Sequence, residues 1–321
     1  MSTYKLDMEQ VFHVAEKLGF EPTGQYFQLN SYENRVFDLF LEAGNVHGLN
    51  RLICKVYRPG RWSLQAIQEE HQFMEELKGQ GIPAVAALSL DGETCFEHQG
   101  LIYSFFPRAQ GRMCEELNFK ELGQIGTQLA KLHNVGAQKV AQHRPRFDIQ
   151  WMGWDALDDL ESWVAPEVWS RYEQAAVTIL NALEHQTEGL PRIRIHGDCH
   201  KGNIRVTDPK VGDKEFFVVD FDDFINGLPV QDFWMLFSSD ESENTAELEA
   251  FLKGYESLRL VDDTQLQLMP LLRGLRIITY AHWVAKRWPV DPTFSQLFPN
   301  FKSYSYWVED TEALEKIAWR L

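Results

Sequence analysis

The chain has 321 residues, 44% of them apolar and 13% aromatic, which is enough to bury the cores of two lobes. Its 31 lysine and arginine residues against 47 aspartate and glutamate residues give a formal net charge of -16, which would repel nucleic acid and anionic membranes. The sequence holds no uninterrupted apolar run of about 18 residues, as a membrane-spanning helix needs, and no Cys-x-x-Cys spacing. We therefore expect a monomeric, cytoplasmic protein with reduced cysteines and without nucleic-acid or membrane partners.

The first 107 residues contain mostly strand-like runs, interrupted by two helical patterns. Ser63 and Asp7 are typical helix-capping residues, and they precede the two expected helices. These helices span 8–18 and 64–78. The expected strands span 26–29, 35–42, 52–57, 84–89, 94–97 and 101–106. This pattern predicts a small, β-rich N-terminal lobe that covers residues 1–107.

After residue 108 the pattern becomes mostly helical. Asn118 and Glu121 form a capping-box pattern in front of an apolar stripe, which predicts a helix. Further helices are expected over 167–185 and from 264 towards 286, and short strands over 192–195, 204–207 and 216–219. We predict a larger, mainly helical C-terminal lobe over residues 108–321, and an α+β fold class for the whole chain.

The residue types that phosphoryl transfer needs are concentrated in two loops. The first reads His-Gly-Asp-Cys-His-Lys-Gly-Asn at 196–203, and the second reads Asp-Phe-Asp-Asp at 220–223. Asp198 is the candidate catalytic residue that accepts or orients the proton of the attacking hydroxyl. Asn203 and Asp220 offer the hard oxygen ligands that Mg²⁺ prefers, which makes Asp220 both a metal ligand and a catalytic residue.

The spacing His-Gly-Asp, four variable residues, Asn, followed by Asp-Phe-Asp-Asp, resembles the aminoglycoside phosphotransferase and choline kinase group. Within that group it is most similar to the bacterial stress response serine/threonine protein kinases. The likeness extends to residues 30–35, 55–59, 69–73 and 229–236, and it covers nearly the whole chain. The resemblance implies a two-lobed, protein-kinase-like fold and an enzyme that transfers phosphate from ATP with Mg²⁺ to a hydroxyl group.

The resemblance also implies that the N-terminal lobe holds ATP. Lys55, centred in the apolar run 52–57, is the expected contact of the α- and β-phosphates, the alternative being a solvated lysine. Its expected partner is Glu70, which lies on the apolar stripe of the predicted helix 64–78, with Glu69 as the second choice.

Other residues keep two interpretations. Ser31 lies in a turn without glycine and either donates its hydroxyl to a phosphate or belongs to an ordinary polar turn. Asp222 either touches the second Mg²⁺ or the substrate, or stabilises its loop. The adenine is expected to bind to backbone groups of the segment that includes Phe105, Phe106 and Ala109.

Three polar residues around the catalytic loop have a structural interpretation. By resemblance, His196 packs and forms hydrogen bonds that brace the loop, and Asp232 binds or caps the loop backbone. His200 is left between a brace and a substrate contact. For His196 and Asp232 these expectations concern loop geometry alone.

The sequence leaves the phosphate acceptor undecided, and it leaves two functions other than a kinase as alternatives. The favoured function is a serine/threonine protein kinase, and the nearest alternative phosphorylates a small hydroxylated molecule through the same site. A third interpretation is a metal-dependent hydrolase that would use His196, Asp198, His200, Asp220 and Asp222. That hydrolase would leave Lys55, Glu70 and Asn203 without a role. A fourth is an inactive kinase-like binding module.

Overall fold

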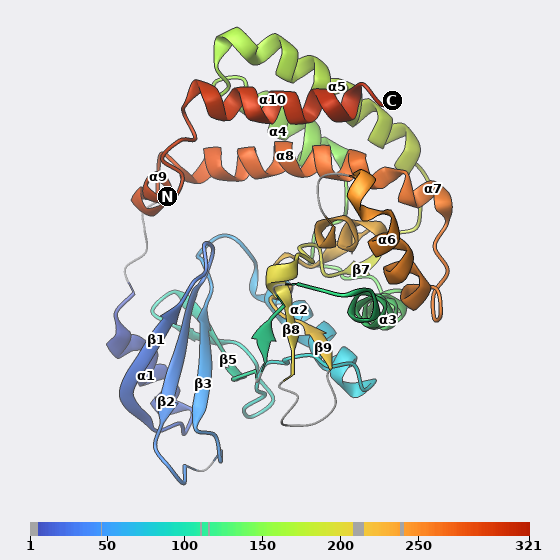
Figure 1. Ribbon diagram of the computed structural model, residues 1–321. Helices are drawn as coiled ribbons and strands as arrows, with labels where there is room; N and C mark the ends of the chain where they lie inside the picture. The colour runs from blue at the N-terminus through green and yellow to red at the C-terminus, as the bar shows by residue number, and fades with distance from the viewer. Residues whose placement is uncertain (1–5, 46, 110, 115, 208–214, 238–240) are drawn as a thin grey trace.

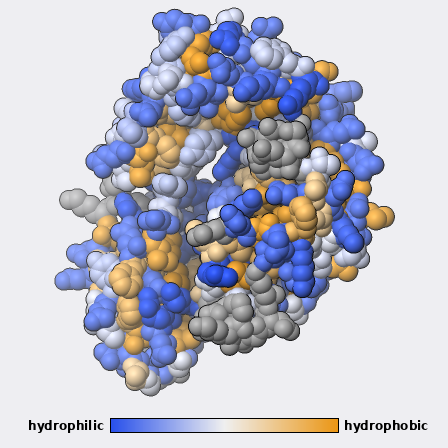
Figure 2. All heavy atoms as spheres, viewed as in Figure 1, coloured by the Kyte–Doolittle hydropathy of each residue, from blue (hydrophilic) through white to orange (hydrophobic). Residues whose placement is uncertain are grey.

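The structure is a computed structural model that describes residues 6–45, 47–109, 111–114, 116–207, 215–237 and 241–321, with the backbone alone for 241–244. An antiparallel sheet with two helices forms the N-terminal lobe, and a larger, mostly helical lobe follows (Figure 1). The space-filling view shows the molecule hollowed between the two lobes (Figure 2). The predicted α+β, two-lobed arrangement is present. No helix in the described parts of the chain is both long and apolar enough to cross a membrane.

The N-terminal sheet has five antiparallel strands in the order β1-β2-β3-β5-β4. The strands are β1 (Pro22–Leu29), β2 (Arg35–Leu41), β3 (Arg51–Val56), β4 (Phe96–His98) and β5 (Leu101–Pro107). Helix α1 (Met8–Lys17) and one face of the sheet enclose an apolar core. Helix α2 (Leu64–Gly79) lies at the border of the larger lobe. Asp7 and Ser63 cap these two helices as predicted.

The predicted strand over 84–89 is wrong, because this segment has no strand pairing. Ala86 is buried, and the apolar side chains beside it pack against the cores of both lobes. The amide of Leu88 donates a single hydrogen bond to the carbonyl of Phe105 at 2.7 Å. The apolar run therefore reflects the burial of an irregular connection, which a strand pattern resembles in sequence.

The C-terminal lobe holds eight helices within the described residues. They are α3 (Phe119–Gly136), α4 (Asp155–Leu160), α5 (Pro166–Thr187), α6 (Glu241–Tyr255), α7 (Asp263–Leu266), α8 (Leu268–Arg287), α9 (Pro292–Leu297) and α10 (Tyr304–Ala318). Asn118 and Glu121 form the predicted capping box of α3. The single helix expected from residue 264 is divided into α7 and α8.

Short strands of the C-terminal lobe carry the loops that the sequence marks as functional. Strand β7 (Ile193–Ile195) pairs with β10 (Ile225–Gly227), and β6 (Arg112–Met113), β8 (Ile204–Val206) and β9 (Phe216–Val218) form a second small sheet. The loop 196–203 leaves β7, and the loop 220–223 follows β9. The two loops are thus held next to each other by strand pairing.

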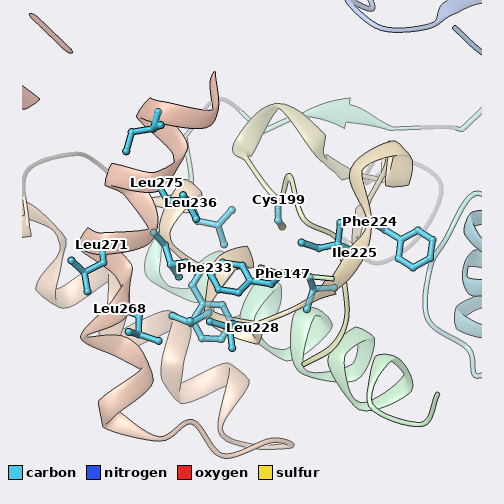
Figure 3. Packing of buried hydrophobic residues seen from close by; sticks show 14 of the residues in the cluster. Phe147, Cys199, Phe224, Ile225, Leu228, Phe233, Leu236, Leu268, Leu271 and Leu275 are labelled. Atoms are coloured by element: carbon cyan, nitrogen blue, oxygen red, sulfur yellow. The ribbon is translucent and has the colours of Figure 1, made fainter. Parts of the chain in front are cut away.

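Helix α8 is fixed to the core of this lobe along one face. Leu268 and Leu275 of α8 lie on the side of Phe233 and Leu236, which follow the second loop, and Leu271 belongs to the same buried cluster (Figure 3). Helices α5 and α10 pack on the other sides of α8, and the three form one layer (Figure 1). Because its inner face is anchored in this way, α8 can present its outer side chains at defined positions towards the loops.

Candidate active site

The loop between β7 and the short 3₁₀ turn Lys201–Asn203 forms a tight bend around Asp198. Gly197 has a left-handed backbone with φ of 83°, and a Cβ at this position would collide with the carbonyl oxygen of Asp223. The residue after the bend, Cys199, points into the apolar core beside Leu236 and Ile225 (Figure 3). Burial raises the pKa of its thiol well above the usual range, so Cys199 anchors the loop as an apolar side chain.

His196 braces the loop through both ring nitrogens. Nδ1 accepts a hydrogen bond from the amide of Asp198 at 3.2 Å, so Nε2 carries the proton and donates to the carbonyl of Val219 at 3.0 Å. The buried ring packs edge-on against Phe221, with centroids 4.7 Å apart. The contacts expected from the resemblance are present, and they leave neither nitrogen of His196 for a metal ion, as the hydrolase interpretation would need. In the described parts of the chain, no three His, Cys, Asp or Glu side chains are grouped as a metal site.

Asp232 binds the backbone of the same loop. Its two carboxylate oxygens accept hydrogen bonds from the amides of His196 and Gly197, each at 2.8 Å. His133 lies 3.0 Å from the carboxylate through Nε2, and burial lowers the pKa of this imidazole. Asp232 is completely buried, so these donors take the place of water around it. The expected contact with the loop backbone is therefore present.

We predict that Asp232→Ala lowers the free energy of unfolding by about 3–5 kcal/mol, because it leaves two buried amides without an acceptor. Urea denaturation of the purified variant measures this change. Asp159→Ala is the matched control, since Asp159 forms ion pairs with His282 and Lys286 at an exposed position. The control should lose less than about 1 kcal/mol. Equal losses in the two variants would contradict the role of Asp232.

Asn203 and Asp220 are brought together by the pairing of β8 with β9, in which Ile204 lies opposite Val218. The side-chain amide of Asn203 donates to the carbonyl of Asp198 at 3.0 Å, which turns its oxygen away from the loop. Asp220 has a left-handed backbone, with φ of 66° and ψ of 66°, and its side chain is 57% exposed. One amide oxygen and one exposed carboxylate are thus available at neighbouring positions, and this donor set suits Mg²⁺.

Lys55 extends from β3 towards these groups and is surrounded by carboxylates. Its Nζ lies 3.1 Å from Glu70, 2.9 Å from Asp222 and 3.8 Å from Asp220. Burial alone would lower the pKa of Lys55, but Asp222 and Glu70 raise it well above its usual value, so the amine stays charged. The structure forms the predicted ion pair with Glu70. Glu69 instead accepts the backbone amides of Gln142 and His143.

Asp222 points inward, unlike Asp220. Its Oδ1 accepts hydrogen bonds from Lys55 and from the side-chain amide of Asn34, the latter at 2.9 Å, and its Oδ2 forms an ion pair with Arg61. Burial alone would raise the pKa of Asp222, but Lys55 and Arg61 hold it below its usual range. Both oxygens are engaged with protein donors, which favours the loop-stabilising interpretation of Asp222 over metal binding.

Arg144 is a buried member of the site that the sequence did not indicate. Its Nη2 lies 3.1 Å from Glu70 and donates to the carbonyls of Phe221 and Asp222 at 3.2 and 3.1 Å. The guanidinium also lies over the ring of Phe224, 4.5 Å from its centroid. Arg144 therefore joins helix α2 to the loop that carries Asp220. Glu70 and Arg144 are 74 residues apart in the chain, and no local pattern connects them.

The turn between β1 and β2 reaches across to the C-terminal lobe. Glu33 binds the indole of Trp283 and the guanidinium of Arg287, both on α8. A cavity of about 410 Å³ lies between this turn and α9, and Ser31 is part of its lining. The hydroxyl of Ser31 accepts a hydrogen bond from the backbone amide of Asn34 at 3.3 Å, as in an ordinary polar turn. The contact of Ser31 with a phosphate group stays a prediction.

The segment expected to bind adenine comprises the end of β5 and the residues that follow it. The ring of Phe105 lies in the core of the N-terminal lobe, and its carbonyl accepts the amide of Leu88. Phe106 is buried against the larger core, where it meets His71 edge-on, and Ala109 is half-buried. The backbone from Phe105 to Ala109 remains the predicted adenine contact.

Arg276 of α8 is a second member of the site that sequence reasoning missed. Its Nη2 lies 2.9 Å from Oδ1 of Asp198, while His200 lies 3.6 Å from Oδ2 through Nε2. The Asp198 side chain is 17% exposed and the Arg276 side chain 41% exposed. The candidate catalytic carboxylate is thus paired with a cation from a distant helix at the opening of the site.

Comparison with known proteins gives matches along most of the chain. The pattern of the phosphotransferase enzyme family (APH) matches residues 28–269. Stress response kinase A of Salmonella choleraesuis (strain SC-B67) is 34% identical over 286 residues, which are 88% of this chain and 84% of that protein. A protein of Salmonella typhimurium strain LT2 named serine/threonine protein kinase RdoA is also 34% identical, with the same coverage of 88% and 84%.

Solved structures of similar fold include a small-molecule complex of a kinase. Amicoumacin kinase hAmiN, in complex with AMP-PNP, Ca²⁺ and Ami, superimposes with a TM-score of 0.74. The superposition covers 97% of this chain and 94% of that one, at 20% sequence identity. At 20% identity this similarity establishes the fold but does not identify the phosphate acceptor of this chain.

Proposed function

Because the chain belongs to the phosphotransferase enzyme family and is a kinase of a hydroxyl acceptor, we propose that it phosphorylates serine or threonine residues of a protein with ATP and Mg²⁺. The observation that carries this proposal is the position of Lys55. Its Nζ extends from the N-terminal sheet to within 3.8 Å of Asp220, so the predicted phosphate contact and the predicted metal ligand border one cleft. We propose residues 107 and 108 as the boundary of the two lobes.

Each group of the cleft has a role in this proposal. Lys55, held by Glu70, contacts the α- and β-phosphates, and the oxygens of Asn203 and Asp220 hold Mg²⁺. When bound, the metal neutralises charge on the phosphates during transfer. Asp198 orients the acceptor hydroxyl and takes its proton. Asp222 holds Lys55 and the turn residue Asn34 in place, and we assign it no metal.

The name of one curated relative, serine/threonine protein kinase RdoA, favours a protein acceptor, and that protein is 34% identical over 88% of this chain. A small hydroxylated acceptor is the second candidate, and one specific observation supports it. Tyr32, Tyr280, Trp283 and Phe298 form an aromatic cluster between the turn and α8, with ring centroids 5.4 to 6.2 Å apart. Such a cluster can stack against a ring-containing molecule as well as against a peptide side chain.

Incubation of the wild-type protein with γ-labelled ATP and Mg²⁺ tests the proposal. We expect label to be transferred to a generic protein acceptor on serine or threonine, and transfer to stop when the divalent metal is chelated. A panel of small hydroxylated compounds in parallel reactions tests the second candidate. Label in a small compound and none in protein would overturn the protein acceptor, while absence of any transfer would overturn the kinase proposal itself.

A further inference from the structure

Most acidic side chains around the cleft are paired with arginines, although the protein carries a net charge of -16. Asp220 is the exception, since its side chain is 57% exposed and its cation neighbour is Lys55 at 3.8 Å. Asp198 pairs with Arg276 at 2.9 Å, and Asp223 pairs with Arg61 at 2.5 Å. Further pairs are Asp222 with Arg61, Glu70 with Arg144, Glu33 with Arg58, Arg61 and Arg287, and Asp291 with Arg58. These carboxylates are therefore already compensated inside the protein. A pocket for a polycationic acceptor needs carboxylates whose charge is left to the ligand.

Arg276 differs from the other arginines of this group because it binds the candidate catalytic carboxylate. Its contact with Asp198 joins residues 78 positions apart, from a loop and from α8. Arg276 lies one residue after Leu275, which is buried in the core, so its backbone position is fixed. Its guanidinium also lies 5.9 Å from the ring centroid of Tyr280, one turn further along the same helix.

The contact leaves the two oxygens of Asp198 in different surroundings. Oδ1 accepts from the charged guanidinium, a hydrogen bond that fixes the orientation of the carboxylate. Oδ2 faces His200, whose ring lies 3.6 Å away and whose side chain is 44% exposed. Oδ1 is thus held at hydrogen-bond distance by the guanidinium, while Oδ2 has only the half-exposed imidazole 3.6 Å away and is the oxygen that we assign to the acceptor hydroxyl.

We propose that Arg276 is a positioning and specificity residue for the phosphate acceptor. It orients Asp198 through Oδ1, and its charge at the opening of the site favours a neutral or acidic serine- or threonine-containing segment over a polycationic acceptor. This inference rests on the proposed function and narrows its acceptor. In this inference the positive charge of Arg276, next to Asp198, determines which acceptors the enzyme prefers.

Two peptides of equal length, each with one serine and flanked by either acidic or basic residues, test the inference in the γ-labelled ATP assay. An aminoglycoside serves as a polycationic small acceptor. We expect wild-type kcat/KM for the acidic peptide to exceed that for the basic peptide by about tenfold, as expected for loss of one charged interaction. Arg276→Gln should reduce this ratio to about threefold or less and lower kcat.

Arg276→Lys separates the two parts of the role. The lysine keeps the positive charge but lacks the planar fork that holds a carboxylate, so the acidic preference should persist while kcat falls. Lys286→Gln is the matched control, because it removes one positive charge from α8 at a side chain that pairs with Asp159 instead of Asp198. The control should keep the wild-type ratio and kcat, and all three variants should bind ATP like the wild type.

The possible results separate this inference from the proposed function. A wild-type ratio and kcat in Arg276→Gln, with ATP binding intact, would overturn the inference alone. Wild-type preference for the basic peptide or for the aminoglycoside would overturn it as well and leave the phosphotransferase activity standing. Absence of transfer from ATP to any acceptor by the wild-type protein would overturn the proposed function and the inference together.

Discussion

Asp198→Asn is expected to lower kcat for phosphate transfer by roughly 10²–10⁴-fold, the usual contribution of a positioned general base. The asparagine keeps an oxygen that can accept from Arg276, so the loop geometry should survive. It loses the charge that attracts the proton of the acceptor hydroxyl. Because the predicted ATP contacts come from Lys55 and the metal ligands, nucleotide affinity should stay close to that of the wild type.

Single-turnover transfer with labelled ATP measures the rate in Asp198→Asn, and calorimetric titration measures ATP affinity in the same preparation. We expect the transfer rate to fall while the ATP affinity stays close to that of the wild type. Turnover within a few-fold of the wild type would show that Asp198 is not the base. A parallel loss of nucleotide binding would instead place Asp198 among the nucleotide contacts.

Asp220→Asn should reduce Mg²⁺-dependent turnover by about 10²–10³-fold, as expected when several kcal/mol of charge stabilisation by a bound metal are weakened. Asparagine is the informative replacement because Asp220 has a left-handed backbone, which asparagine tolerates and alanine does not. The substitution therefore removes one charge without adding backbone strain. The Mg²⁺ concentration that gives half-maximal activity should rise.

Asp223→Asn provides the comparison for Asp220→Asn. It removes the same charge three residues further along, from a side chain that is 46% exposed and pairs with Arg61. Initial rates over a range of Mg²⁺ concentrations, measured in both variants, distinguish a metal ligand from a nearby acidic residue. If Asp220→Asn and Asp223→Asn show the same modest change, the metal role of Asp220 fails.

Local sequence patterns predict the parts of this fold that depend on local interactions. The capping residues Asp7, Ser63 and Asn118 begin their helices because each side chain satisfies backbone amides within three residues. The resemblance supplies the expectation of a glutamate partner for Lys55, and the helical period, which places Glu70 on the buried face of α2, selects Glu70 over Glu69. In the same way, Gly197 marks a bend that a side chain would block.

The arginines of the site could not be predicted in this way. Arg144, Arg61 and Arg276 each contact a carboxylate that is distant in sequence, and charged residues of this kind are common on exposed surfaces. Tertiary packing brings them to the loops: Arg276 comes from α8, Arg144 from the segment between α3 and α4, and Arg61 from the turn between β3 and α2. The burial of Asp222 has the same origin, since Asn34, which binds it, is 188 residues away.

The predicted helix partner of Lys55 is held more firmly than an isolated ion pair. Carboxylates along α2 bind the segment around 139–144: Glu69 accepts two backbone amides, Glu70 pairs with Arg144, and Glu76 pairs with Lys139 at 2.7 Å. Glu76 also pairs with Arg194 at 2.8 Å. Helix α2 is thus tied to the C-terminal lobe over most of its length, which keeps Glu70 beside Lys55.

The central claim is that Lys55, Asn203 and Asp220 bind one Mg²⁺–triphosphate in the cleft beside Asp198. The crystal structure of the protein with Mg²⁺ and a non-hydrolysable ATP analogue tests it most directly. We expect a metal ion about 2.0–2.1 Å from the Asn203 side-chain oxygen and the Asp220 carboxylate, with Lys55 in contact with the phosphates. A triphosphate bound elsewhere, or a metal that touches neither Asn203 nor Asp220, would contradict the account.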